Sequence, residues 1–243
     1  MKTIILTLGL VSFGLNPFTG GAFALTPFSD NFNAPKLDTD AWTPGGEGGA
    51  KLKQTNGVLR FLVPKNKADE DYAFLELKGI YPGYNESWQV IVDVTNTNEH
   101  RGNSAPGFWI SSGDDPSDVV FFEFYGKGPK GGFIASFTNN GVYNVGPDLV
   151  TNPGVTKGSL KVTFSKTTKI ITFWHDKTGS ANGYQWVKLG TFSTNGVGGS
   201  RRADWLMNDE TSYFTIRIFG FSEGKIVAAG TETLDNFAVK SLK

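Results

Sequence analysis

Apolar and polar residues alternate along short segments of this chain, and turn-forming residues separate these segments. In 87–95 (SWQVIVDVT), the side chains of Trp88, Val90, Val92 and Val94 fall on one face of a predicted strand. A period of two residues is typical of a half-buried β-strand. Because such segments recur at short and fairly regular spacing, the pattern predicts an all-β domain built as a sandwich or a barrel.

Turn chemistry indicates where the predicted strands reverse direction. Segments 159–165 and 169–174 predict the clearest hairpin, and Asn140-Gly141 predicts a tight turn because both residues tolerate positive φ. The 31 glycines and 20 phenylalanines also fit an all-β chain, since Gly serves tight turns and Phe favours pleated surfaces. Only 201–208 (RRADWLMN) has helical character, and its length allows no more than a turn or two.

The N-terminus has the features of a secretory signal peptide. Lys2 precedes an apolar run over 3–15 that is too short to span a bilayer, and Ala22-Phe23-Ala24 supplies the small-x-small pattern that signal peptidase requires. We therefore predict a signal peptide at 1–24, cleaved after Ala24, and one mature domain at 25–243. The expected location is secreted or periplasmic.

Charge and cysteine content limit the classes of partner. No other apolar run is long enough for a membrane span, and the chain has no Cys with which to form disulfides. Residues 25–243 contain 22 basic and 23 acidic side chains, so no strong positive field favours a nucleic acid. The domain is long enough to be stabilised by its own hydrophobic core.

Several motifs resemble those of the concanavalin A-like lectin/glucanase superfamily. SDNFNAPKLDTDAW (29–42) is similar to its first strand, and LDNFAV (234–239) is similar to the closing strand that pairs beside the first. GFWISS (107–112) followed by VVFFEFYG (119–126) resembles the paired concave strands of laminarinase-type glucanases. The resemblance implies a jelly roll of two curved antiparallel sheets, the concave one forming a groove for an extended glycan.

The resemblance also allows a test for catalysis. Retaining glucanases of this superfamily carry Glu-x-Asp-x-(x)-Glu on one strand, because their mechanism needs two carboxyl groups about 5–5.5 Å apart. The matching face here is Val119, Phe121, Glu123 and Tyr125, so two of the carboxylates are replaced by Val and Phe. We expect no catalysis of the laminarinase kind, with Glu123 the one candidate catalytic residue if a non-standard arrangement exists. Its partner would then come from another strand, with Asp93, Arg217 and His175 as candidates.

A binding surface is the alternative use of the same residues. Aromatic rings stack on the C–H-rich faces of pyranoses, and flanking polar groups bind the hydroxyls. We predict a glycan-binding surface formed by Trp109, Glu123, Tyr125, Arg217 and Phe219. The competing interpretation makes the aromatic residues part of the core and Glu123 and Arg217 a cross-strand ion pair.

No cofactor is required by any motif, but a structural calcium ion is a further prediction. Many sandwich carbohydrate modules tie their first and last strands together with calcium, and Asp30 and Asp235 resemble the positions of such ligands. Carboxylate oxygens are suitable ligands for this ion. Asn31 and Asn236 beside them are able to cap turns instead.

We therefore expect a secreted, lectin-like β-sandwich that binds a polysaccharide or glycan and is non-catalytic. The first alternative is a glycoside hydrolase or polysaccharide lyase with a non-standard site around Glu123. The second is a structural or protein-binding envelope protein, in which the concave face is filled or shallow and an apolar patch is exposed elsewhere.

Overall fold

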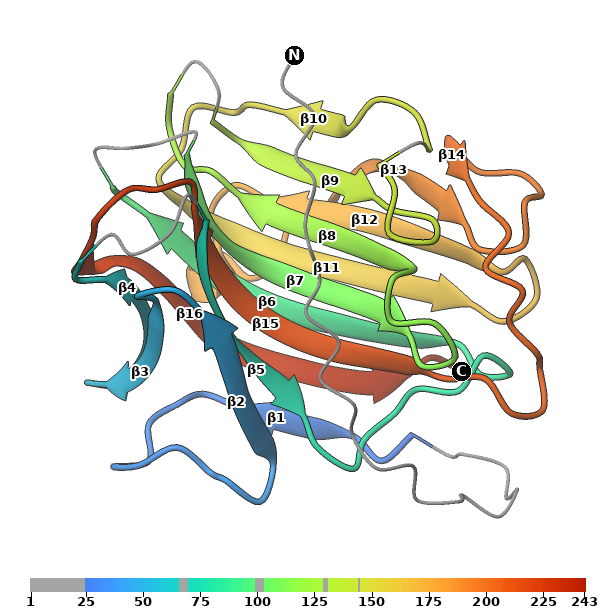
Figure 1. Cartoon of the computed structure of the whole chain (residues 1–243), viewed down its shortest axis with the longest axis horizontal. Helices are drawn as coiled ribbons and strands as arrows, with labels where there is room; N and C mark the ends of the chain where they lie inside the picture. The colour runs from blue at the N-terminus through green and yellow to red at the C-terminus, as the bar shows by residue number, and fades with distance from the viewer. Residues whose placement is uncertain (1–24, 66–69, 99–102, 129–130, 144) are drawn as a thin grey trace.

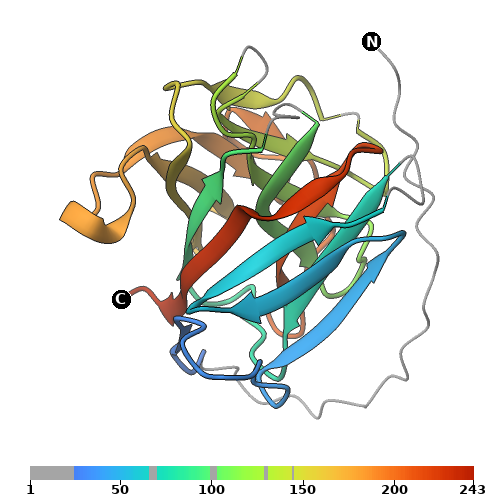
Figure 2. The same ribbon diagram turned by 90° about the vertical axis from the view of Figure 1, so that its left-hand side faces the viewer.

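The computed structural model describes residues 25–65, 70–98, 103–128, 131–143 and 145–243. The predicted signal peptide at 1–24 lies outside the described residues. Two β-sheets face each other in a sandwich (Figures 1 and 2). The prediction of an all-β, two-sheet antiparallel sandwich is confirmed. In the part of the chain that is described, no helix is both long enough and apolar enough to cross a membrane.

The first sheet has nine strands in the order β14-β13-β12-β11-β6-β16-β4-β3, with β1 pairing beside β16. Its strands are β1 (Phe28–Asp30), β3 (Lys51–Thr55), β4 (Val58–Val63), β6 (Trp88–Asn96), β11 (Lys157–Ser165), β12 (Ile170–Asp176), β13 (Val187–Ser193), β14 (Arg201–Arg202) and β16 (Val227–Ser241). All pairs in this sheet are antiparallel except β13 with β14.

The second sheet has seven strands in the order β10-β9-β8-β7-β15-β5-β2, which follow one another across Figure 1. Its strands are β2 (Trp42–Glu47), β5 (Asp71–Leu77), β7 (Ser104–Ser112), β8 (Val119–Phe124), β9 (Phe133–Phe137), β10 (Leu149–Thr151) and β15 (Phe214–Ser222). Every pair is antiparallel. A 3-10 turn, η1 (Ser180–Asn182), lies in the loop between β12 and β13.

The core fills the space between the sheets with the side chains that the alternation assigns to one face. Trp88, Val90, Val92 and Val94 of β6 are buried, as predicted. Aromatic rings join the two sheets: the centroid of Phe122 in β8 lies 5.4 Å from that of Phe173 in β12, in an edge-to-face arrangement. Such pairs stabilise a core beyond the area that they bury.

Three local predictions are confirmed. Strands β11 and β12 form the expected hairpin. Asn140 and Gly141 have φ values of 51° and 73°, as the predicted tight turn requires. The first and last strands pair, with Phe28 opposite Val239 and Asp30 opposite Phe237.

The expected helical turn at 201–208 is wrong. Arg201 and Arg202 form strand β14, and the backbone amides of Ala203 and Trp205 donate to the carbonyls of Ser193 and Thr194. Trp205 is buried against Phe192, with ring centroids 5.1 Å apart. The backbone of this segment forms hydrogen bonds with the end of β13 instead of the internal hydrogen bonds of a helix. Tertiary contacts therefore override its local helical preference.

Candidate functional site

The candidate site is the outer face of the seven-stranded sheet, the face turned away from the core. Residues directly opposite one another in antiparallel strands share a face. Trp109 of β7 lies opposite Phe121 of β8 on one side and Arg217 of β15 on the other. Gly107, two residues before Trp109, lies opposite Glu123 and Phe219 in the same way. The register therefore brings four of the five predicted residues onto one face.

Tyr125, the fifth predicted residue, follows the end of β8 and belongs to the same surface. Its hydroxyl donates to Glu123 Oε2 over 3.4 Å, and its ring packs edge-to-face against Phe221 at 6.0 Å. We call this surface the aromatic face. It also includes Phe121 of β8, which the sequence pattern placed on the same face as Glu123. Four further members were missed by the sequence interpretation, namely Tyr72 and Phe74 of β5, Phe221 of β15 and the loop residue Tyr143.

The rings of the aromatic face pack mainly on one another. Trp109 is 4% exposed and Phe219 is 3% exposed, with 6.3 Å between their ring centroids. Tyr143 is 45% exposed and stacks on Phe121 at 6.2 Å. Trp109 and Phe219 thus form a floor, while Tyr143 and the half-buried rings of β5 and β15 form the accessible rim. The competing interpretation, that the aromatic residues of this surface are buried, is therefore correct for Trp109 and Phe219 but not for the rings of the rim.

Arg217 is fixed at the centre of the aromatic face. Its Nε donates to Glu76 Oε2 over 2.7 Å, and its Nη2 lies 2.7 Å from the same oxygen. The guanidinium carbon lies 4.7 Å from the ring centroids of both Phe74 and Trp109. Ion pairing and cation–π contact together hold the planar group in one orientation, with 16% of its side chain exposed.

The ion pair between Glu123 and Arg217, one of our two interpretations, is wrong. Arg217 lies opposite Glu76 of β5, so its nearest carboxylate is in the neighbouring strand. Glu123 lies beyond β7 and opposite Gly107, one step further along the sheet. A side chain at position 107 would collide with the backbone of β8, since its Cβ would lie 2.2 Å from the carbonyl oxygen of Phe122. Glycine therefore permits the close pairing beside Glu123.

Glu123 is a buried carboxylic acid. It is 7% exposed, and burial, followed by the negative charge of Asp148, raises its pKa to about 8. Glu223 adds to the rise, and the hydrogen bond from Tyr125 opposes it. Burial also raises the pKa of Tyr125, with the charge of Glu123 as the second cause. At neutral pH the site therefore contains a protonated carboxyl beside a neutral phenol.

Two of the candidate partners for Glu123 lie in the other sheet. Asp93 is in β6, where its carboxylate accepts hydrogen bonds from Ser159, Ser180 and Asn236. His175 is in β12, where its ring stacks on Phe133 at 4.7 Å and burial lowers its pKa. The acidic groups that do influence Glu123, Asp148 and Glu223, come from segments between strands, and no strand pattern pointed to them.

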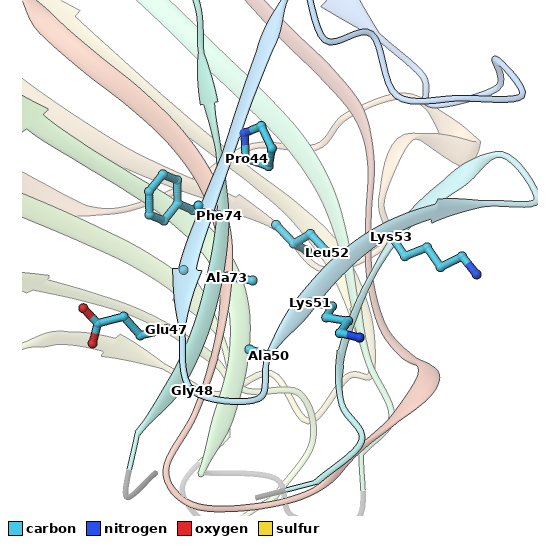
Figure 3. A pocket seen from close by; sticks show the side chains of 11 residues that line it. Pro44, Glu47, Gly48, Ala50, Lys51, Leu52, Lys53, Ala73 and Phe74 are labelled. Carbon is cyan, nitrogen blue, oxygen red and sulfur yellow. The ribbon is translucent and has the colours of Figure 1, made fainter. Parts of the chain in front are cut away.

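A hollow lies at the edge of the sandwich, next to the aromatic face. It has a volume of about 590 Å³ and opens between edge strands β2 and β3, with Phe74 shared between the hollow and the aromatic face. Figure 3 shows Glu47 pointing to the side opposite that of Lys51 and Lys53. The polar side chains that line this hollow therefore point in different directions and do not form a convergent polar site.

The predicted calcium ligands lie close together but are occupied by protein donors. Asp30 accepts hydrogen bonds from the Phe32 amide at 2.7 Å and from Trp42 Nε1 at 2.9 Å, one on each oxygen. Asp235 accepts from the amide of Asn236 at 2.7 Å. Burial raises the pKa of Asp235, and the charges of Asp93 and Asp30 add to the rise. Among the described residues no group of three or more acidic, His or Cys side chains suited to a metal occurs, and the calcium site stays a prediction.

Removing the Asp30 carboxylate tests how the first strand is held. We expect Asp30→Ala to lower the free energy of unfolding by about 1–3 kcal/mol, because Trp42 Nε1 loses its acceptor in a part-buried position. Denaturant unfolding with and without chelator measures this, and the loss should be the same in both. A melting temperature that drops on chelation in the unmodified protein, but not in Asp235→Ala, would establish the calcium prediction instead.

The protonation of Glu123 generates a pH dependence of stability. The unfolded chain ionises this carboxyl near pH 4.5 and the folded protein near pH 8, so between these values the folded state binds one more proton. The free energy of unfolding therefore falls as pH rises through this window, by up to about 1.4 kcal/mol per pH unit. Glu123→Gln should remove this contribution. Its stability relative to the unmodified protein should improve from pH 4.5 to pH 8, and a constant difference would contradict the assignment.

No protein-family model matches the sequence, and a search of curated proteins finds no match. Solved structures do match. A structure from work on endo-acting O-glycanases that human gut microbes express to initiate mucin breakdown has a TM-score of 0.59 at 15% identity, covering 89% of this chain and 99% of its own. The lectin UEA-II in complex with galactose has a TM-score of 0.59 at 11% identity, covering 90% and 99%.

A putative β-glucanase from Mycobacterium abscessus is a third similar structure, with a TM-score of 0.52 at 11% identity, covering 87% of this chain and 98% of its own. At these identities the likeness establishes the fold and leaves the activity open. The two-sheet topology and these similar structures agree with the resemblance seen in the sequence motifs. The chain has the concanavalin A-like jelly-roll fold that lectins and glucanases share.

Proposed function

We propose that this is a secreted protein that binds a glycan on the aromatic face of the seven-stranded sheet. The observation that carries the proposal is the fixed guanidinium of Arg217 among aromatic rings, with a second polar pair, Glu123 and Tyr125, on the same face. Aromatic surface with a few well-placed polar groups is the usual composition of a sugar site.

The polar groups of this face suit sugar hydroxyls. The neutral carboxyl of Glu123 both donates and accepts, and the Tyr125 hydroxyl does the same. Trp109 Nε1 is buried and has no hydrogen-bond acceptor in the described residues, so a ligand oxygen that reached it would satisfy an unpaired donor. Tyr143 supplies an accessible ring at the rim.

Binding without cleavage is the form of the proposal that the residues favour. The face of β8 that would carry a paired nucleophile and acid carries Val119, Phe121 and Glu123, so the strand itself supplies one carboxyl. Similar structures that include a galactose-bound lectin support a glycan as the ligand class. Secretion rests on the N-terminal sequence pattern alone.

A depletion assay, in which a panel of polysaccharides removes the protein from solution, tests the proposal. The polymer that retains the protein is then titrated with the variants. We expect Glu123→Gln and Tyr143→Ala to weaken binding about tenfold, by loss of a hydrogen bond and of a stacking ring. Leu206→Ala, which removes a side chain that is 83% exposed in the segment between β14 and β15 and is not part of the aromatic face, is the control. Unchanged affinity in both test variants would overturn the proposal.

A second candidate function is glycan cleavage with Glu123 as the general acid. One observation favours it: a carboxyl with a pKa of about 8 holds its proton at neutral pH, as a general acid must. Incubation with the retained polysaccharide and detection of new reducing ends tests this function. Product formation that Glu123→Gln abolishes would support cleavage, and no product from the unmodified protein would reject it.

A further inference from the structure

A second aromatic cluster lies on the opposite side of the molecule, on the outer face of the nine-stranded sheet. Trp174 of β12 lies opposite Lys161 of β11 and opposite Lys188 of β13. The loop 177–186, which projects from the sandwich in Figure 2, adds two stacked rings, Tyr184 and Trp186, at 4.7 Å and 20°. We call Lys161, Trp174, Tyr184, Trp186 and Lys188 the lysine–indole cluster. It shares no residue with the aromatic face.

Lys161 is the unusual member of this cluster. Its Nζ lies 4.8 Å from the ring centroid of Trp174 and 4.4 Å from that of Trp186, so the ammonium is held by both indoles. Burial lowers its pKa. Neither Lys161 nor Lys188 forms an ion pair with any residue that the structure describes. Two cations thus flank Trp174, and no described carboxylate forms an ion pair with either of them.

The carboxylates near the cluster are already committed to other donors. Asp93 accepts from Ser159, Ser180 and Asn236. Asp176 accepts from the amide and hydroxyl of Thr178 at 2.7 Å each and from the amide of Gln185. These acids anchor the 177–186 loop to the sheet and leave the ammonium of Lys161 available to an external anion.

The same bonds make the surface rigid before any ligand arrives. Trp174 Nε1 donates to Thr163 Oγ1 over 3.2 Å, which fixes the indole plane. Tyr184 is held by stacking on Trp186, yet 37% of the residue stays exposed. A preorganised aromatic platform loses little conformational entropy when it binds.

We propose that the lysine–indole cluster is a second ligand site that binds an acidic polysaccharide. A pyranose ring stacks on the exposed face of the Tyr184–Trp186 pair, and the carboxylate of a uronic acid pairs with Lys161 and Lys188. Charge complementarity favours an acidic polymer, because the cluster offers two cations that form no ion pair with a described carboxylate. Stacking rings with adjacent cations are suited to a sugar acid more than to a simple anion.

Affinity electrophoresis or titration with polygalacturonate, alginate and hyaluronate tests the site, with neutral pullulan for comparison. We expect at least one acidic polymer to bind and its affinity to fall with added salt. Lys161→Met should weaken that binding about tenfold, the loss of one charge-assisted hydrogen bond, and Trp186→Ala should weaken it comparably. Lys166→Met is the matched control, because Lys166 is an exposed lysine in the turn that follows β11.

A further variant tests whether the two faces bind independently. Tyr143→Ala, on the aromatic face, should leave the binding of the acidic polymer unchanged, so the two proposals fail or stand independently. Absence of binding to all three acidic polymers by the folded protein would overturn this inference, and so would equal affinities of Lys161→Met and Lys166→Met. Sedimentation in which Trp186→Ala converts a dimer to a monomer would also overturn it, since the cluster would then be covered by a second copy of the chain.

Discussion

The pairing register of β7 with β8 and β15 is the constraint on which the candidate site depends. It sets Trp109 between Phe121 and Arg217, and Gly107 between Glu123 and Phe219. A slip of β7 by one residue would turn its own side chains to the other face. Trp109 would then enter the core and lose its place beside Arg217, so the core and the outer face are specified by the same set of hydrogen bonds.

Aromatic residues cover both the inner and the outer face of the seven-stranded sheet. Every residue of β7 from Ser104 to Ser112 is buried. The inward rings fill the core, and the outward rings protect one another while supporting Arg217. The charged group of Arg217 is stable among packed rings because Glu76 pairs with it. Glu123 pairs with no cation of the described residues and instead retains its proton. On the same face, one buried ionisable group is thus stabilised by an ion pair and another by remaining neutral.

The sequence predicts the fold well because its signals are local or repeated. Alternation in β6 and turn residues at Asn140-Gly141 each act over a few positions. The partner of Arg217 could not be predicted, since Glu76 is 141 residues away and is brought near by strand order. The inward face of β7 could not be predicted from the sequence either, because apolar residues occupy both faces of this strand. Asp148 and Glu223 influence Glu123 from loops, where no period relates sequence to position.

The outer faces of the two sheets differ in their chemistry. The aromatic face has a paired arginine and a protonated acid, while the lysine–indole cluster has unpaired cations. The central claim is that glycan contacts the first of these. Mapping backbone amide shifts during titration with an oligosaccharide of the retained polymer tests it most directly. Our account predicts that the shifts concentrate on β5, β7, β8 and β15, and shifts confined to other strands would contradict it.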